Sequence, residues 1–294
     1  MVRLGGEPES SNFEDRTGQS FGGGMGGGGG GLGLLLGLVG SRFGIVGVLV
    51  LLLGYCALSS LGVVGGGSPM GGGEAGQTSA SKLDPNVRQF LVSALGSTED
   101  TWGEIFQKSG QRYQPTTLVA YTDYNQSGCG AAQAAMGPFY CPNDKKIYVD
   151  PAFFNELSQR FGAPGDFAMA YVIAHEVGHH IQDLEGTLDR AHQAQARTSE
   201  TGGNAIQVGV ELQADCYAGV WAANARDEKG SIIEQGDLEE GMRAAEAIGD
   251  DTLQKQAQGR VVPESFTHGS SAQRMEALRR GMTTGDPAQC NYSR

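Results

Sequence analysis

His175 and His179 stand four residues apart, with Glu176 between them, in the sequence His-Glu-Val-Gly-His. Residues at this spacing share one face of a helix, so the two imidazoles can bind one metal ion. A zinc ion held in this way lowers the pKa of a bound water to about 7, and a carboxylate beside it can take the proton. The motif therefore predicts a zinc-dependent hydrolase in which Glu176 activates the attacking water.

A catalytic zinc site needs a third protein ligand and one open position. The metzincin continuation requires glycine and histidine where this chain has Gln182 and Glu185, which excludes it. Glu211 and Asp215 are the better candidates, because they share a face of the helix predicted at about 205–226. Paired acids often mark a solvated surface, but the apolar flanks of this helix favour buried carboxylates with partners. We expect Glu211 to bind zinc and Asp215 to accept the free ring N–H of a ligating histidine.

Five sequence blocks are similar, in order, to the neutral zinc metallopeptidase family of bacterial membrane-anchored proteins. The similarity covers about residues 82–290 and includes TEDTWGEIF (98–106), GPFYCPNDKKIYVD (137–150), AHEVGHHIQ (174–182), ELQADCYAGVWA (211–222) and FTHGSSAQR (266–274). The resemblance implies a zincin-like domain with zinc on His175, His179 and Glu211, and with Glu176 as the catalytic carboxylate.

The later blocks also resemble the Ste24-type metallopeptidases, in which an E-x-x-x-D segment and then a histidine-containing block follow the motif. This resemblance implies that His268 donates a hydrogen bond to the developing oxyanion and that Arg274 orders His268. A structural alternative remains open, in which His268 only caps the helix predicted from Ser271.

Zinc endopeptidase activity on a peptide or protein substrate is the function that these residues predict. The substrate backbone would pair with an edge strand, for which Lys146–Asp150 is the candidate. The alternative is a non-catalytic cell-envelope binding module that retains zinc as a structural staple. Such a site is usually closed by a fourth protein ligand, which His192 or His268 could supply.

The elements that must position these residues are mostly helical. We therefore predict an α+β fold, predominantly helical. The apolar spacing predicts strands at 118–124 and 146–149, and helices at 85–95, from Ser97 onward, 167–184, 205–226, 238–258 and 271–281.

The first eighty residues have a different character. Residues 1–42 are predicted to be a Gly-rich, disordered cytoplasmic tail. Residues 43–64 contain no charge over 22 positions, which is long enough for one transmembrane helix. A signal peptide is the alternative, but a preceding segment with four acidic residues is a poor n-region. Residues 65–81 would be a flexible Gly/Ser linker to a metallopeptidase domain at 82–294.

The cysteines indicate in which cellular compartment the domain lies. Cys129 and Cys141 are spaced for a local disulfide that closes a loop in an oxidising environment. Zinc ligation by these cysteines is the alternative, although the chain has no C-x-x-C pair. The pairing of Cys216 and Cys290 stays open. We expect a single-pass protein of the cell inner membrane, with its catalytic domain extracytoplasmic, on the periplasmic side.

The formal net charge of -12 argues against nucleic acid as a partner, because binding a polyanion needs clustered Lys and Arg. The expected partners are a peptide or protein substrate and, through one helix, the membrane.

Overall fold

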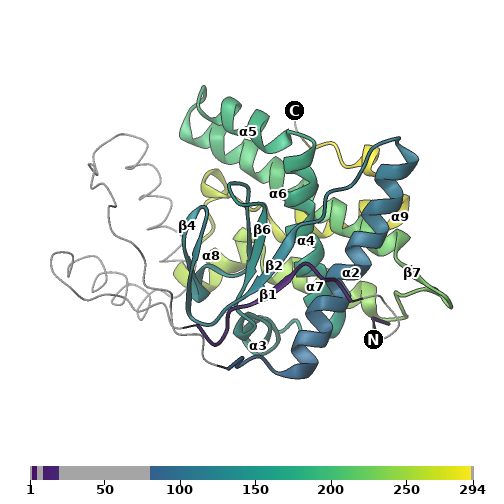
Figure 1. The fold of residues 1–294 in the computed structure, drawn as a ribbon. Helices are drawn as coiled ribbons and strands as arrows, with labels where there is room; N and C mark the ends of the chain where they lie inside the picture. Colours follow the sequence, from purple (N-terminus) through teal and green to yellow (C-terminus); the bar gives the residue numbers. More distant parts are fainter. Residues whose placement is uncertain (1, 5–8, 20–79, 293–294) are drawn as a thin grey trace, which may run out of the picture.

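The computed structural model describes residues 2–4, 9–19 and 80–292. Within these ranges the fold is α+β and predominantly helical, as predicted (Figure 1). The strands are β1 (Phe13–Asp15), β2 (Thr117–Ala120), β3 (Tyr124–Ser127), β4 (Gly130–Gln133), β5 (Phe139–Cys141), β6 (Lys146–Val149), β7 (Arg226–Asp227) and β8 (Gly230–Ser231). The helices are α2 (Pro85–Lys108), α3 (Ala152–Gln159), α4 (Asp166–Leu184), α5 (Thr187–Gln195), α6 (Glu200–Asn224), α7 (Asp237–Ala247), α8 (Asp250–Gln258) and α9 (Ser271–Thr284).

The main sheet has the strand order β1-β2-β6-β5, and Figure 1 shows β1, β2 and β6 side by side. β1, β2 and β6 run parallel, and β5 pairs antiparallel with β6. The prediction that Lys146–Asp150 is an edge strand is wrong, because β6 lies between β2 and β5 and its backbone groups are used on both sides. The edge strand on this side of the sheet is β5.

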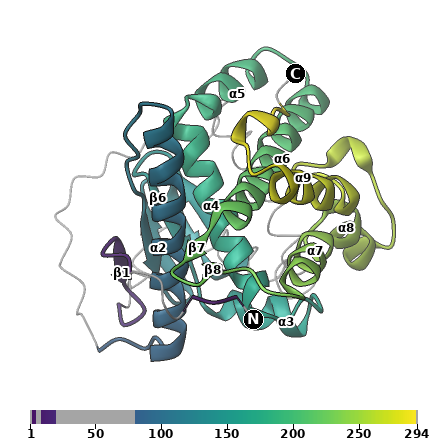
Figure 2. The same cartoon turned by 90° about the vertical axis from the view of Figure 1, so that its right-hand side faces the viewer.

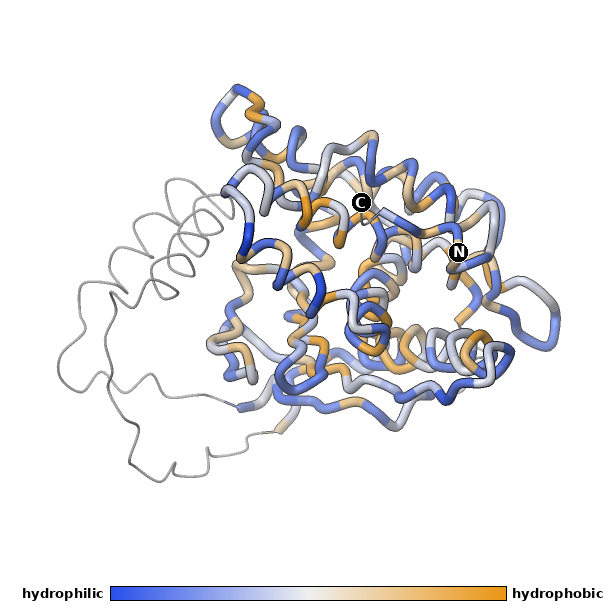
Figure 3. The backbone as a smooth tube through the Cα atoms, turned by 90° about the horizontal axis from the view of Figure 1, so that it is seen from above, coloured by the Kyte–Doolittle hydropathy of each residue, from blue (hydrophilic) through white to orange (hydrophobic). Residues whose placement is uncertain are grey.

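Helices α4 and α6 form the centre of the domain. Ile173, Val177 and Ile181 on α4 are fully buried, and α4 packs against α2, α6 and α7. α6 packs in turn against α9, and Figure 2 shows α4, α6 and α9 following one another across the molecule. Hydrophobic segments lie mainly in the interior and hydrophilic ones along the outline (Figure 3).

Two helix boundaries differ from those predicted. α2 continues without a break through Ser97, because this side chain is buried and accepts a hydrogen bond from the Trp221 indole at 3.1 Å instead of capping a new helix. The helix predicted over 238–258 is divided into α7 and α8 at Gly249. A Cβ at Gly249 would lie 2.4 Å from the Ser271 backbone nitrogen, so the chain passes close to the start of α9 there.

Part of the expected N-terminal tail belongs to this fold. β1 pairs with β2, and the backbone N–H of Leu118 donates to the carbonyl of Asn12 at 2.9 Å. Val2 and Leu4 are only 7% and 6% exposed and join the main core. Residues 13–15, expected within a disordered tail, therefore form an edge strand of the domain.

The expected placement of the domain behind a single transmembrane helix is wrong. In residues 2–4, 9–19 and 80–292, no helix is both long and apolar enough to cross a bilayer. The segment 43–64 lies outside the described residues.

Two disulfide bonds connect the elements. The predicted bond between Cys129 and Cys141 is confirmed, and it ties the β3–β4 hairpin to the end of β5. A second bond joins Cys216 in the middle of α6 to Cys290 near the C-terminus, a pairing that the sequence left open.

Candidate metal centre and cleft

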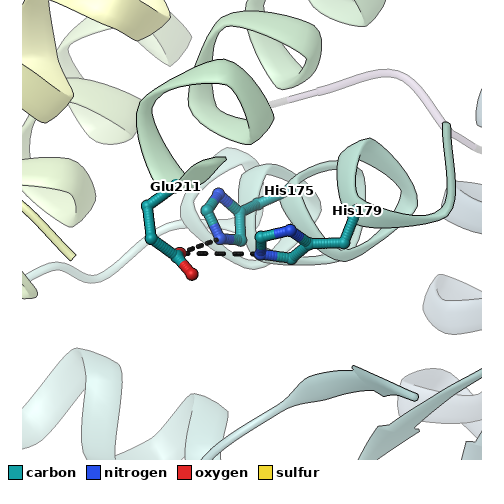
Figure 4. Close-up of side chains that lie close together, drawn as sticks. All are labelled: His175, His179 and Glu211. Atoms are coloured by element: carbon teal, nitrogen blue, oxygen red, sulfur yellow. Dashed lines mark ion pairs between the residues drawn. The ribbon is translucent and has the colours of Figure 1, made fainter. Parts of the chain in front are cut away.

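His175 and His179 from α4 meet Glu211 from α6 (Figure 4). The Nε2 atoms of the two histidines lie 3.2 and 3.5 Å from Glu211 Oε2. Their rings are almost perpendicular, with centroids 4.8 Å apart. The structure thus brings together the three residues predicted as metal ligands, with one ligand atom from each facing a common point.

The donor set fits zinc. Bonds of about 2.0–2.1 Å in a tetrahedral site imply separations of about 3.3–3.4 Å between ligand atoms. The two separations from Glu211 Oε2 bracket this value. Among the described residues, no fourth His, Cys, Asp or Glu joins the group, so neither His192 nor His268 closes it. Three protein donors with one open position are typical of catalytic zinc.

Asp215 holds His175 in place. The Nδ1 atom of His175 lies 2.8 Å from Asp215 Oδ1, which leaves Nε2 for the metal. Asp215 is fully buried and also accepts hydrogen bonds from the Arg274 Nε and Nη2 atoms, each at 2.9 Å, and from the Tyr171 hydroxyl at 2.6 Å. Burial alone would raise the pKa of Asp215, but Arg274 and His175 lower it to about 2. Asp215 therefore lies where it was predicted.

The other two ligands have partners that sequence reasoning missed. Gln182 Oε1 accepts from His179 Nδ1 at 2.9 Å, and Gln182 Nε2 donates to the Val210 carbonyl at 2.7 Å. Gln207 Nε2 donates to Glu211 Oε1 at 2.9 Å. In the sequence, Gln182 follows His179 by three residues and Gln207 precedes Glu211 by four. Such spacings are too common in helices to identify either glutamine as a partner without the structure.

The electrostatics of the group favour a positive charge at its centre. Burial lowers the pKa of His175, but Asp215 and Glu211 outweigh it and raise the value to about 10. Burial raises the pKa of Glu211, yet the two imidazoles hold it well below its ordinary value. The surroundings thus stabilise a cation between these side chains, either as protons on the imidazoles or as a bound metal ion.

Glu176 lies in the same cleft. The cavity has a volume of about 580 Å³, and its lining includes all three ligand residues together with Glu176 and His268. Glu176 is only 6% exposed, and burial raises its pKa. A carboxylate with a raised pKa beside a metal centre is suited to taking up and returning a proton.

His268 lines the cleft, but its partner is not the predicted one. Its Nδ1 atom lies 3.4 Å from Asp250 Oδ1, and Asp250 Oδ2 accepts from the backbone N–H groups of Thr267, His268 and Gly269 at 2.7, 2.6 and 3.0 Å. The side chain of Arg274 instead binds Asp215, Tyr171 and the Ile248 carbonyl. Sequence reasoning missed Asp250, which at the start of α8 resembles an ordinary helix-capping acid.

Comparison with known proteins agrees with this geometry. The family model described as "Putative neutral zinc metallopeptidase" matches residues 2–292. The chain is 45% identical over 298 residues to Uncharacterized protein YpfJ of Escherichia coli strain K12, covering 99% of this chain and 98% of that protein. It is 37% identical over 222 residues to Uncharacterized protein Rv2575 of Mycobacterium tuberculosis strain H37Rv, covering 72% and 74%. No solved structure matches the chain.

Proposed function

This chain belongs to the neutral zinc metallopeptidase family, and on that premise we propose that it is an endopeptidase that hydrolyses peptide bonds with Glu176 as its general base. The observation that carries the proposal is the set of three donors, His175, His179 and Glu211. Within residues 2–4, 9–19 and 80–292 this set has no fourth protein ligand, and it opens into the same cleft as Glu176. The zinc ion would supply a Lewis acid that polarises the substrate carbonyl and lowers the pKa of water.

The side chains of the cleft then have distinct tasks. Glu176 accepts a proton from the attacking water and returns it to the leaving amine. His268 donates a hydrogen bond to the substrate carbonyl oxygen as negative charge develops there. Burial lowers the pKa of His268, but the hydrogen bond to Asp250 raises it above the ordinary value, which favours the imidazolium form with both N–H groups.

The substrate backbone has a docking edge in β5. This strand pairs only with β6 in the described sheet, and the residues Gly137 to Tyr140 line the cleft. An extended peptide can add to such an edge through main-chain hydrogen bonds. β5, and not Lys146–Asp150, is therefore the strand that we propose to pair with the substrate backbone.

The structural-staple alternative is less well supported. A closed zinc site usually has four protein ligands. His192 and His268 both line the cleft, yet neither belongs to the donor group among the described residues. An open position is what hydrolysis needs.

We also propose an extracytoplasmic compartment for the domain and a peptide or protein as its substrate. Two disulfide bonds favour an oxidising, extracytoplasmic environment. The acidic balance of the chain favours a peptide or protein substrate over nucleic acid.

Replacing Glu176 tests the function. Glu176→Gln keeps the size of the side chain and should retain one equivalent of zinc while losing hydrolysis of a randomised peptide library. Glu104→Gln is the matched control, because Glu104 is exposed on α2 and forms an ion pair with Lys108 at the surface. If the Glu176→Gln variant cleaved the peptide library at the wild-type rate, the assigned role of Glu176 would be refuted. Zinc-loaded wild-type protein that cleaves no peptide would favour the structural-staple alternative.

A further inference from the structure

The C-terminal segment of the chain lies against the helix that carries the third metal ligand. Residues 285–292 follow α9, and within this range Cys290 alone is buried. Its disulfide bond joins it to Cys216, in the middle of α6. A Cβ placed on Gly209 would meet the carbonyl oxygen of Tyr292 at 3.0 Å, so the segment continues along α6 toward the N-terminal half of this helix. The segment is therefore held on an element that supplies a metal ligand.

Gln213 of α6 connects this segment to the metal centre. Its side chain is largely buried, and its Nε2 atom donates to the backbone carbonyl of Cys290 at 2.9 Å. Its Oε1 atom accepts from Gln182 Nε2 at 3.0 Å. Gln182 Oε1 accepts in turn from His179 Nδ1. A continuous chain of three hydrogen bonds thus runs from the Cys290 carbonyl to a metal-binding imidazole.

The direction of each hydrogen bond in this chain fixes the next one. A carboxamide has an acceptor oxygen and a donor nitrogen, so reversing the group exchanges a donor for an acceptor. The Cys290 carbonyl can only accept, so it holds the nitrogen of Gln213 toward itself and leaves the oxygen of Gln213 for Gln182. Both N–H groups of Gln182 are then used, because the second donates to the Val210 carbonyl at 2.7 Å. The oxygen of Gln182 is left to face His179.

This orientation decides which nitrogen of His179 carries the ring proton. An oxygen acceptor beside Nδ1 places the proton on Nδ1 and leaves Nε2 free for the metal. A reversed Gln213 would turn its N–H groups toward those of Gln182, and two donors with no acceptor between them repel. If Gln182 then reversed as well, its N–H groups would face Nδ1 and the ring proton would move to Nε2, where the metal must bind.

We propose that Gln213 is a positioning residue of the metal centre, which sets the tautomer of His179 because the Cys216–Cys290 disulfide holds the Cys290 carbonyl in place. This inference rests on the proposed function, because it concerns the same metal ligands. It gives the disulfide a task besides stabilising the fold. The affinity of the centre for zinc then depends on a covalent bond between two residues that are not ligands.

NMR spectroscopy of the full, zinc-loaded chain gives the first test, because a ring N–H held in a hydrogen bond exchanges slowly with water and gives its own signal. The wild type should show a signal from Nδ1–H of His175 and another from Nδ1–H of His179. Gln213→Leu should lose the signal of His179 and keep that of His175, whose partner is Asp215. Gln107→Leu, on the exposed face of α2, is the matched control and should keep both signals.

Competition with a chelator gives the second test. Gln213→Leu should raise the zinc dissociation constant about tenfold. Cys216→Ala combined with Cys290→Ala removes the disulfide without adding thiols that bind zinc, and it should raise the constant by a similar factor. All three substitutions together should raise it no further, because they break one chain of hydrogen bonds, whereas independent effects would multiply to about a hundredfold. Cys129→Ala combined with Cys141→Ala removes the other disulfide and should leave the constant unchanged.

The NMR signals decide whether Gln213 acts on the metal centre itself. If His179 kept its signal in Gln213→Leu, the inference would be overturned. Loss of both histidine signals would also overturn it, since Gln213 would then support the fold in general. Gln213→Leu keeps the disulfide, so this result stands even if the variant without Cys216 and Cys290 does not fold.

The zinc measurements separate this inference from the proposed function, because they need no substrate. An unchanged dissociation constant for Gln213→Leu would overturn the inference while leaving peptide hydrolysis by the wild type unaffected. A hundredfold rise for the three substitutions together would show that the disulfide acts by another route and would overturn the link to Cys290. A wild-type chain that binds zinc but cleaves no peptide would end the proposed function alone.

Discussion

Gly178 of α4 lies directly against the backbone of Ala214 in α6. A Cβ on Gly178 would come within 2.9 Å of the Ala214 carbonyl oxygen and 3.0 Å of its Cα. Ala214 lies between Glu211 and Asp215, so this contact sets the distance from the two histidines to both carboxylates. A position that the His-Glu-x-x-His pattern leaves unspecified thus controls the approach of the two helices.

Gly178→Ala should therefore weaken metal binding. The added methyl group has to push α6 away from α4, which separates Glu211 from the imidazoles. We expect the zinc dissociation constant, measured by competition with a chelator, to rise about tenfold or more. Gly103→Ala is the control, because a Cβ at Gly103 in α2 meets nothing within 4 Å. An unchanged dissociation constant for Gly178→Ala would show that the contact does not control the site.

Gln182→Leu should also weaken metal binding, by a different route. The side chain loses the oxygen that accepts from His179 Nδ1 and the amide that donates to Val210. Loss of such an orienting partner typically lowers metal affinity by about 10–100-fold. Chelator competition measures the effect, circular dichroism checks the fold, and Gln107→Leu on the exposed face of α2 is the control. Equal zinc affinity in both variants would show that Gln182 has no orienting role.

Asp250→Asn should lower stability most at mildly acidic pH. Burial raises the pKa of Asp250, but hydrogen bonds from His268 and from backbone N–H groups lower it below its ordinary 3.8. The ionised Asp250 carboxylate therefore adds to the free energy of unfolding above pH 3.8, and this stabilisation is lost as the pH falls through the lowered pKa. The pKa of His268 is raised above its ordinary 6.5. The protonated His268 imidazole therefore adds to the free energy of unfolding below pH 6.5, and this stabilisation is lost as the pH rises through the raised pKa.

Urea unfolding of wild type and Asp250→Asn across this range measures the difference in the free energy of unfolding. The difference should be largest between about pH 4 and pH 6.5 and smaller at both extremes. A difference that stays constant from about pH 3 to pH 9 would contradict the assigned pairing.

Removing the N-terminal segment should destabilise the domain. A chain that begins at Ser81 lacks β1 and the buried Val2 and Leu4, which leaves one edge of β2 unpaired. We expect the free energy of unfolding to fall by at least about 2 kcal/mol in chemical denaturation. A peptide of residues 2–19 added in excess should restore part of the loss, and the same peptide with Glu14→Pro should not, since proline cannot complete the strand. Full stability without the segment would show that β1 is dispensable.

The sequence alone was enough to name the three residues that the structure groups as a candidate metal centre, because a helix fixes the spacing of its own residues. His175, Glu176 and His179 depend only on one helix, and Glu211 with Asp215 only on a second. The apolar flanks of α6 supplied the further information that its carboxylates are buried. No distance between the helices was needed to name these residues.

The parts that could not be predicted depend on contacts between elements. Gln182 and Asp250 acquire their roles only when α4 meets α6 and when α8 meets the segment before α9. β1 is a three-residue strand, Phe-Glu-Asp, with no alternation to reveal it. The position of β6 inside the sheet follows from the strand order, which hydrophobic spacing does not encode.

The pairing of β1 with β2 also constrains how the protein is made. On the ribosome the chain emerges from its N-terminus, so residues 13–15 are synthesised about a hundred positions before the partner strand at 117–120. During that interval the first strand has no template to pair with. Closing the sheet at this edge must therefore wait until much of the domain has left the ribosome, so residues 13–15 are among the last to acquire their native contacts although they are made well before their partner strand.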